Sequence, residues 1–172
     1  MIRAFIGIPL PEELILMCLV AQGHLHTGRA VPRDNLHLTL LYLAEQPKPQ
    51  LEDLAEELDA ILHRPVPLRV TGFDVIGGFK GARHCVASVA ALEPLNDLQA
   101  KTVRAARAVG IEIERRRFRP HITLVRNFKG SSMPPWDGQA RDIFAPRFSL
   151  YQSTLKQDGA EYDSLADFTL TN

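Results

Sequence analysis

Two short segments of the chain share the pattern His-apolar-Thr-Leu, one beginning at His37 and the other at His121. Each is predicted to be a β-strand, in which side chains two positions apart lie on the same face. His37 and Thr39 then share one face, as do His121 and Thr123, while the apolar residues between them face a core. Two imidazoles, each beside a hydroxyl group, suit acid–base chemistry at a phosphate. The copies lie about half of the 172-residue chain apart, which predicts two related lobes.

The repetition decides between a structural and a functional interpretation of these histidines. A single histidine in a strand is usually structural, and two solvated strand faces would be the simplest explanation of polar side chains there. Matched His, Thr and Leu positions in both copies favour a functional pair instead. The other four histidines, His24, His26, His63 and His84, lack such a pattern, although His84 begins a strand and could lie near the cleft.

Other kinds of site fit the sequence less well. A catalytic zinc site needs about three protein ligands, and threonine is a poor one, so we expect no metal and no cofactor. No serine or cysteine lies in a recognisable nucleophile motif, and Cys85 is expected to fill the core. We therefore predict catalysis by the two histidines without a metal.

Arginines flank the second motif and could bind a phosphate. Arg119 has the same strand parity as His121 and Thr123, so it is predicted to line the same cleft. Arg126 has the opposite parity. It would lie on that face only if the strand bulges or ends before it, and parity alone argues against it.

Composition limits the class of protein. The chain is 45% hydrophobic and 23% charged, and its 20 basic residues balance 20 acidic ones, so no overall field favours long nucleic acids. Cys18 and Cys85 stand apart in apolar segments, as expected of reduced, buried thiols. The apolar run over 14–21 is too short to span a bilayer. The opening residues predict a strand rather than a secretory signal. We expect a cytoplasmic monomer without membrane association.

Periodicity predicts an α+β fold. Strands are expected over 2–8, 36–43, 66–76, 83–90, 119–127, 146–156 and 161–170, and helices over about 11–25, 50–63 and 92–108. Residues 77–81 and 128–141 are predicted loops, and residues 157–159 form a hairpin turn. No linker is long enough to separate two domains, so residues 1–172 are expected to form one domain.

The sequence resembles the 2H phosphoesterase superfamily, and within it the RNA 2′,3′-cyclic phosphodiesterases, also called 2′-5′ RNA ligases. The likeness covers nearly the whole chain. It is carried by residues 3–11 (Arg-Ala-Phe-Ile-Gly-Ile-Pro-Leu-Pro), by the two motifs with their flanks at 35–40 and 118–126, and by the ending over 148–153. The chain departs from the family pattern at Ala44, where glycine is usual, at Val31, and at His84-Cys85, where larger apolar residues are common.

The resemblance implies a bilobal α+β fold with two pseudo-symmetric lobes of antiparallel sheet, helices outside and a central cleft. It implies hydrolysis of the 2′,3′-cyclic phosphate of RNA ends or of small cyclic nucleotides to 2′-phosphates. By the motif match, His37 would be the general acid and His121 the general base. Thr39 and Thr123 would bind phosphoryl oxygens. Arg126 matches a family arginine near the phosphate.

Three alternatives remain open at the level of sequence. The chain could act on another cyclic or 2′-5′-linked nucleotide, or it could be a non-catalytic module that binds RNA ends. Ligation of RNA ends through a 2′-5′ bond is the reverse reaction and could occur in vitro.

Overall fold

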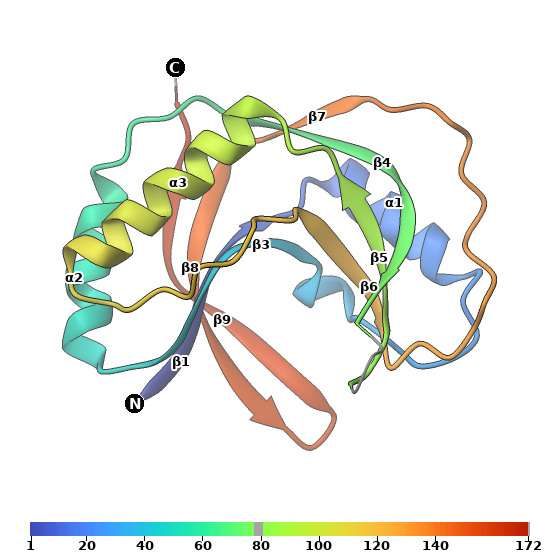
Figure 1. Cartoon of the computed structure of the whole chain (residues 1–172), viewed down its shortest axis with the longest axis horizontal. Helices are drawn as coiled ribbons and strands as arrows, with labels where there is room; N and C mark the ends of the chain where they lie inside the picture. The colour runs from blue at the N-terminus through green and yellow to red at the C-terminus, as the bar shows by residue number, and fades with distance from the viewer. Residues whose placement is uncertain (78–80, 172) are drawn as a thin grey trace.

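The computed structural model describes residues 1–77 and 81–171, and its elements alternate between strands and helices (Figure 1). Within these residues the order is β1 (Ile2–Pro9), α1 (Glu12–Gln22), β2 (Arg29–Ala30), the 3₁₀ turn η1 (Arg33–Asn35), β3 (His37–Gln46), α2 (Lys48–Asp59), β4 (Val66–Ile76), β5 (His84–Val89), α3 (Glu93–Ala108), β6 (His121–Arg126), β7 (Asp142–Ala145), β8 (Arg147–Lys156) and β9 (Gly159–Thr169).

All seven predicted strands and three predicted helices are present, and the differences lie at their ends. The first helix stops at Gln22 rather than near Leu25, and α2 spans Lys48–Asp59 rather than 50–63. The strands β2 and β7 and the turn η1 were not predicted, because segments of two to four residues show no periodicity. Part of the predicted loop at 77–81 lies outside the described residues.

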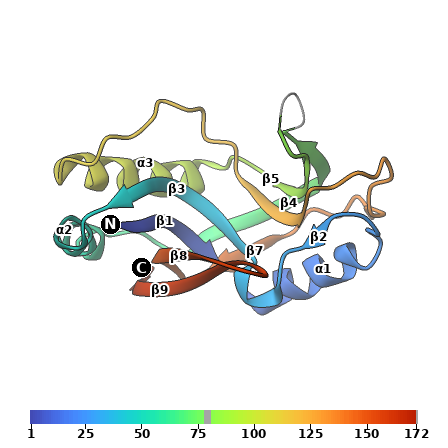
Figure 2. The same cartoon turned by 90° about the horizontal axis from the view of Figure 1, so that it is seen from below.

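The described strands form one antiparallel sheet in the order β7-β4-β5-β6-β3-β1-β8-β9, with β2 beside β6. The two motif strands β3 and β6 therefore lie next to each other at the middle of the sheet, although half the chain separates them in sequence. Figure 2 shows α2 and α3 at one end of the molecule and α1 at the other.

The chain order repeats around this centre. The first motif follows β1 and α1, and the second follows β5 and α3. The helix that precedes each motif contacts the motif strand of the other half: α1 contacts β6, and α3 contacts β3. The predicted α+β class with related halves of antiparallel sheet is confirmed by this topology.

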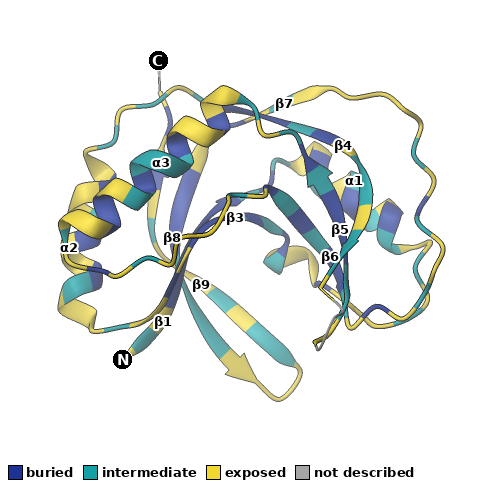
Figure 3. Ribbon diagram, viewed as in Figure 1, coloured by how far each residue is buried: buried dark blue, intermediate teal, exposed yellow. Residues whose placement is uncertain are grey.

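Buried side chains line the strands and the helix surfaces that meet them (Figure 3). Leu38, Ile122 and Leu124 are fully buried, as the alternation predicts. Cys18 and Cys85 are buried free thiols, which confirms the prediction for both. In the described part of the chain no helix has the length and apolarity needed to cross a membrane.

Candidate active site

The pairing of β3 with β6 brings the two motifs onto one face. Leu38 lies opposite Ile122, and both are fully buried. In an antiparallel pair the neighbours on either side of such a residue point to the other face. His37 therefore lies opposite Thr123, and Thr39 opposite His121, so that each imidazole is beside the threonine of the other copy. All four side chains are half-buried on this exposed face.

Both histidine rings are oriented by a backbone carbonyl two residues earlier. His37 Nδ1 lies 2.7 Å from the carbonyl oxygen of Asn35, and His121 Nδ1 lies 2.7 Å from that of Arg119. A carbonyl only accepts hydrogen bonds, so Nδ1 carries the proton and Nε2 is the nitrogen available for chemistry. His37 Nε2 lies 2.8 Å from Thr39 Oγ1.

Aromatic side chains enclose His37. The ring of Phe5 on β1 lies 4.9 Å from the imidazole between centroids, and the Tyr162 ring on β9 meets it edge-on at 5.2 Å. Tyr151 on β8 stacks on Phe5 at 5.0 Å. A Cβ at Gly7 would come within 3.3 Å of the imidazole and of the Phe5 ring, so glycine allows the close approach of β1 without displacing either ring.

These surroundings shift both imidazoles toward the neutral form. Burial, with added repulsion from Arg126 and His121, lowers the pKa of His37 from 6.5 to about 4, against an opposing effect of the Asn35 carbonyl. Burial also lowers the pKa of His121, and the charges of Arg119 and Arg126 act in the same direction. In the free protein at neutral pH, both rings are therefore unprotonated at Nε2.

A β-bulge in β6 places Arg126 on the same face as His121, which corrects the parity argument against it. Cys85 on β5 pairs with Val125, but the next residue, Val86, pairs with Thr123, so Leu124 is an extra residue. Leu124 and Val125 are both buried, and Arg126 returns to the half-buried face. A bulge reverses the alternation of all later residues in a strand.

The same irregularity occurs in β3. Ile6 on β1 pairs with Leu41 and Gly7 pairs with Thr39, so Leu40 is the extra residue. Tyr42 then occupies the position in the first copy that Arg126 occupies in the second, and it is 67% exposed.

A glutamine from the helix across the sheet contacts each bulge. Gln22 Nε2 on α1 donates to the carbonyls of Leu124 and Val31, both at 2.9 Å. Gln99 Nε2 on α3 lies 3.4 Å from the carbonyl of Leu40. In both halves the bulge residue directly follows the threonine and has a glutamine partner. The bulge is therefore repeated together with the motif.

The side chain of Arg119 is bound to a carboxylate, although its charge still acts on His121. Its Nη2 lies 2.8 Å from Asp74 Oδ2 on β4, and the arginine side chain is 60% exposed. Arg126, by contrast, has Tyr162 as the only side-chain hydrogen-bond partner of its guanidinium among the described residues, with Nη2 3.4 Å from Oη. The structure thus brings Arg126 to the paired histidines and ties Arg119 to a carboxylate, while its backbone carbonyl orients His121.

His84 also lies at this site. It pairs with Arg126 across β5 and β6, and burial together with the charges of Arg126 and His121 lowers its pKa. Its Nδ1 is buried without a hydrogen-bond partner among the described residues. Ser88 pairs with His121 on the same strands and reaches the same face.

Several residues of the site were not predicted from the sequence. Phe5, Tyr151 and Tyr162 converge on His37 from strands that are distant in sequence, and no motif links them. The orienting carbonyls of Asn35 and Arg119 carry no side-chain signal. The only available sign was their equal spacing, two residues before each histidine.

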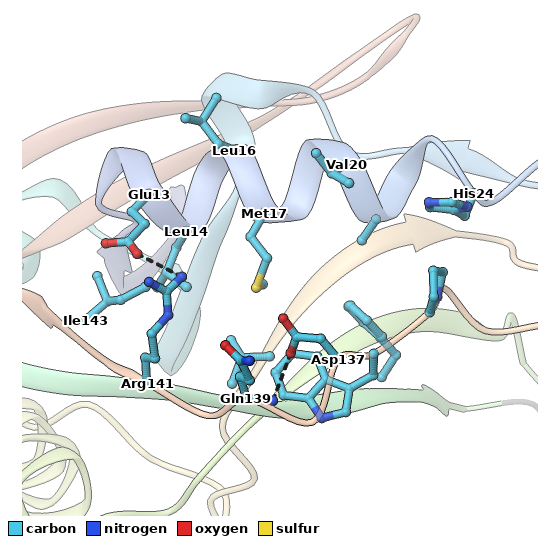
Figure 4. A pocket seen from close by; sticks show the side chains of 15 residues that line it. Glu13, Leu14, Leu16, Met17, Val20, His24, Asp137, Gln139, Arg141 and Ile143 are labelled. Carbon is cyan, nitrogen blue, oxygen red and sulfur yellow. Dashed lines mark hydrogen bonds and ion pairs between the residues drawn. The ribbon is translucent and has the colours of Figure 1, made fainter.

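A cavity of about 420 Å³ lies apart from the paired histidines, between α1 and the segment over 135–143 (Figure 4). Leu16, Met17 and Trp136 line it, and an ion pair of 3.1 Å joins Glu13 to Arg141 at its edge. None of the predicted site residues lines this cavity.

No group of three potential metal ligands occurs in the described residues. Catalysis without a metal remains a prediction.

An antiparallel sheet with duplicated His-x-Thr strands at its centre defines the class of protein. Residues 20–135 match the model of the 2′-5′ RNA ligase superfamily, and the chain belongs to this family.

Named relatives and solved structures agree. The chain is 28% identical to the RNA 2′,3′-cyclic phosphodiesterase of Bacillus subtilis, over 97% of this chain and 96% of that protein. It is 30% identical to the Thermus thermophilus protein of the same name, over 98% and 90%. The apo crystal structure of Escherichia coli LigT superposes with a TM-score of 0.79 at 25% identity, covering 99% of this chain and 98% of that one.

Proposed function

We propose that this protein hydrolyses the 2′,3′-cyclic phosphate at RNA ends to a 2′-phosphomonoester, with His37 and His121 as the acid and the base. One observation carries the proposal: two imidazoles whose Nδ1 atoms are bound to backbone carbonyls lie on adjacent strands of one face, each beside a threonine hydroxyl. The names of the relatives support the same substrate class.

The reaction uses the two rings in opposite protonation states. His121 Nε2 accepts a proton from water as the water oxygen bonds to phosphorus. The bond from phosphorus to the 3′ oxygen breaks, and His37 Nε2–H donates the proton that this oxygen needs. The 2′ ester remains, and solvent exchange restores both imidazoles. Such proton transfers contribute roughly 100- to 10,000-fold each.

Substrate binding favours the uptake of a proton from solvent by His37. In the free protein, burial and, to a smaller extent, the positive charge of Arg126 lower the pKa of His37 and keep the ring neutral. A bound phosphate brings negative charge between the two imidazoles and offsets Arg126, which favours protonation of one ring. Thr39, Thr123 and Arg126 then stabilise the developing charge on the phosphoryl oxygens.

The test is turnover of an oligonucleotide with a 2′,3′-cyclic phosphate end in the presence of a chelator. We expect a 2′-phosphate product and at least a hundredfold loss in both His37→Ala and His121→Ala. The matched control is His26→Ala, an exposed histidine outside the site. Unimpaired turnover in both alanine variants would refute the assignment, and a chelator-sensitive rate would refute metal independence.

A substrate with sulfur in place of the 3′ oxygen separates the two roles, because a thiolate leaves without needing a proton. His37→Ala is then expected to recover most of its loss, whereas His121→Ala is not. The opposite pattern would reverse the roles of acid and base.

A further inference from the structure

Basic side chains continue beyond the paired histidines in a row across three strands. Arg29 on β2 lies opposite Arg126 on β6, and Arg126 lies opposite His84 on β5. Side chains directly opposite each other in antiparallel strands point to the same face, with Cβ atoms about 5 Å apart. The row therefore lies on the catalytic face, one step past Thr123 and His37.

The positive charge of this row is not neutralised by the protein. Among the described residues, no carboxylate lies within ion-pair distance of Arg29 or Arg126, and the nearby Asp74 is bound to Arg119. Like charges directly opposite each other are destabilising, so Arg29 and Arg126 place two unpaired guanidinium charges side by side, while His84 adds an imidazole whose pKa is lowered by burial. Such a row favours a bound anion.

The position of Arg29 separates its role from that of Arg126. Arg126 is next to the paired histidines, where the cyclic phosphate reacts. Arg29 is exposed and lies one strand further out, and its Nη1 is next to Gly159 in the β8–β9 hairpin, where a Cβ would come within 3.2 Å. An RNA strand entering at this edge would bring its next phosphate toward Arg29.

We propose that Arg29, held beside Arg126, binds the phosphodiester immediately upstream of the cyclic phosphate, so that the preferred substrate is an RNA strand end rather than a free cyclic mononucleotide. This inference rests on the proposed function and specifies its substrate class. An arginine suits the role because its guanidinium makes charge-assisted hydrogen bonds to phosphate oxygens.

The experiment compares a dinucleotide ending in a 2′,3′-cyclic phosphate with adenosine 2′,3′-cyclic phosphate, which lacks the upstream phosphodiester. Arg29→Ala is expected to lower kcat/KM about tenfold on the dinucleotide and less than twofold on the mononucleotide. The slope of log kcat/KM against log salt should fall by about 0.7 for the dinucleotide only, as for one lost phosphate contact. Arg29→Lys should retain most of that slope.

Arg107→Ala is the matched control, because Arg107 is an exposed arginine on α3. Equal losses on both substrates, or none on either, would overturn the proposal. Wild-type protein that turns over neither substrate would refute the proposed function instead. In that case, the role of Arg29 is tested by the affinity of the protein for a 3′-phosphorylated dinucleotide. Arg29→Ala must weaken this affinity about tenfold and leave the affinity for the mononucleotide unchanged.

Discussion

Gln22 is expected to act as a positioning residue for Arg126, because it bonds the bulge that turns this arginine toward the paired histidines. Its Nε2 donates to the carbonyls of Leu124 and Val31 at 2.9 Å each. A partly buried hydrogen bond is worth about 1 kcal/mol, so Gln22→Leu should destabilise the protein by about 2 kcal/mol with little change in side-chain volume.

The kinetic effect is expected to exceed what lost stability explains. A bulge without its glutamine partner lets Arg126 shift, and misplacing one charge-stabilising donor costs up to about a hundredfold in kcat. Urea unfolding gives the first quantity, and steady-state turnover of the cyclic phosphate, under conditions where both proteins are folded, gives the second. Gln50→Leu is the matched control. Gln50 on α2 makes a comparable hydrogen bond of 2.9 Å from its Nε2 to the carbonyl of Val109 at the end of α3.

A double-mutant cycle decides whether Gln22 works through Arg126. If it does, Gln22→Leu adds almost nothing to the loss in an Arg126→Ala background, because the group that it positions is absent. Additive losses would refute the reasoning. So would a Gln22→Leu variant as active as Gln50→Leu, because the bulge would then hold its shape without the glutamine.

Three further perturbations test the site and its strands. The free energy of unfolding should fall as pH decreases from 6.5 to 4, because the unfolded chain binds a proton at His37 in this range and the folded protein does not. The contribution of this residue is roughly 3 kcal/mol, present above pH 6.5 and lost by about pH 4, and urea unfolding of His37→Gln should show a weaker pH dependence. Arg126→Ala should lower kcat/KM about a hundredfold or more, whereas Arg119→Ala, whose side chain is bonded to a carboxylate, should lower it less than tenfold; equal losses would place Arg119 at the phosphate. Ala44→Gly should stabilise the protein by about 0.5–1 kcal/mol in thermal or urea unfolding, because Ala44 has a φ of 56°. The control Ala55→Gly in α2 should destabilise the protein by about 1 kcal/mol. A destabilised Ala44→Gly variant would contradict the backbone argument.

The parts of the site that were predictable depend on strand parity. His37 with Thr39, and His121 with Thr123, could be assigned to one face because two residues per repeat is a property of every regular strand. The residue at which that rule fails was also visible, although its meaning was not. Both copies place two apolar residues after the threonine before the next polar one, and this shared break in alternation marks the bulge that brings Arg126 inward.

Other features depend on contacts that a one-dimensional pattern does not contain. The strand β2 has two residues and forms only because β6 offers it a partner, so Arg29 gave no sign of lying beside Arg126. Tyr162 contacts His37 because of the register of the β8–β9 hairpin. The turn at 157–159 predicts that a hairpin forms, but it does not predict where the hairpin lies relative to His37. Similarly, the left-handed backbone at Ala44 explains why the related family has glycine there, but φ cannot be inferred from an alanine.

A symmetric scaffold still has to produce two different catalytic groups, and the surroundings of the histidines supply the difference. Phe5 and Tyr162 enclose His37, whereas His121 makes no aromatic contact among the described residues and lies in a more exposed position. In the proposed mechanism, the enclosure by Phe5 and Tyr162 suits His37 to donate to the departing oxygen once a bound phosphate favours its protonation. The more open ring can reach a water molecule, which suits a general base. The duplicated strands therefore fix where the two imidazoles lie, and we propose that the aromatic residues around His37 alone determine which ring gives up a proton.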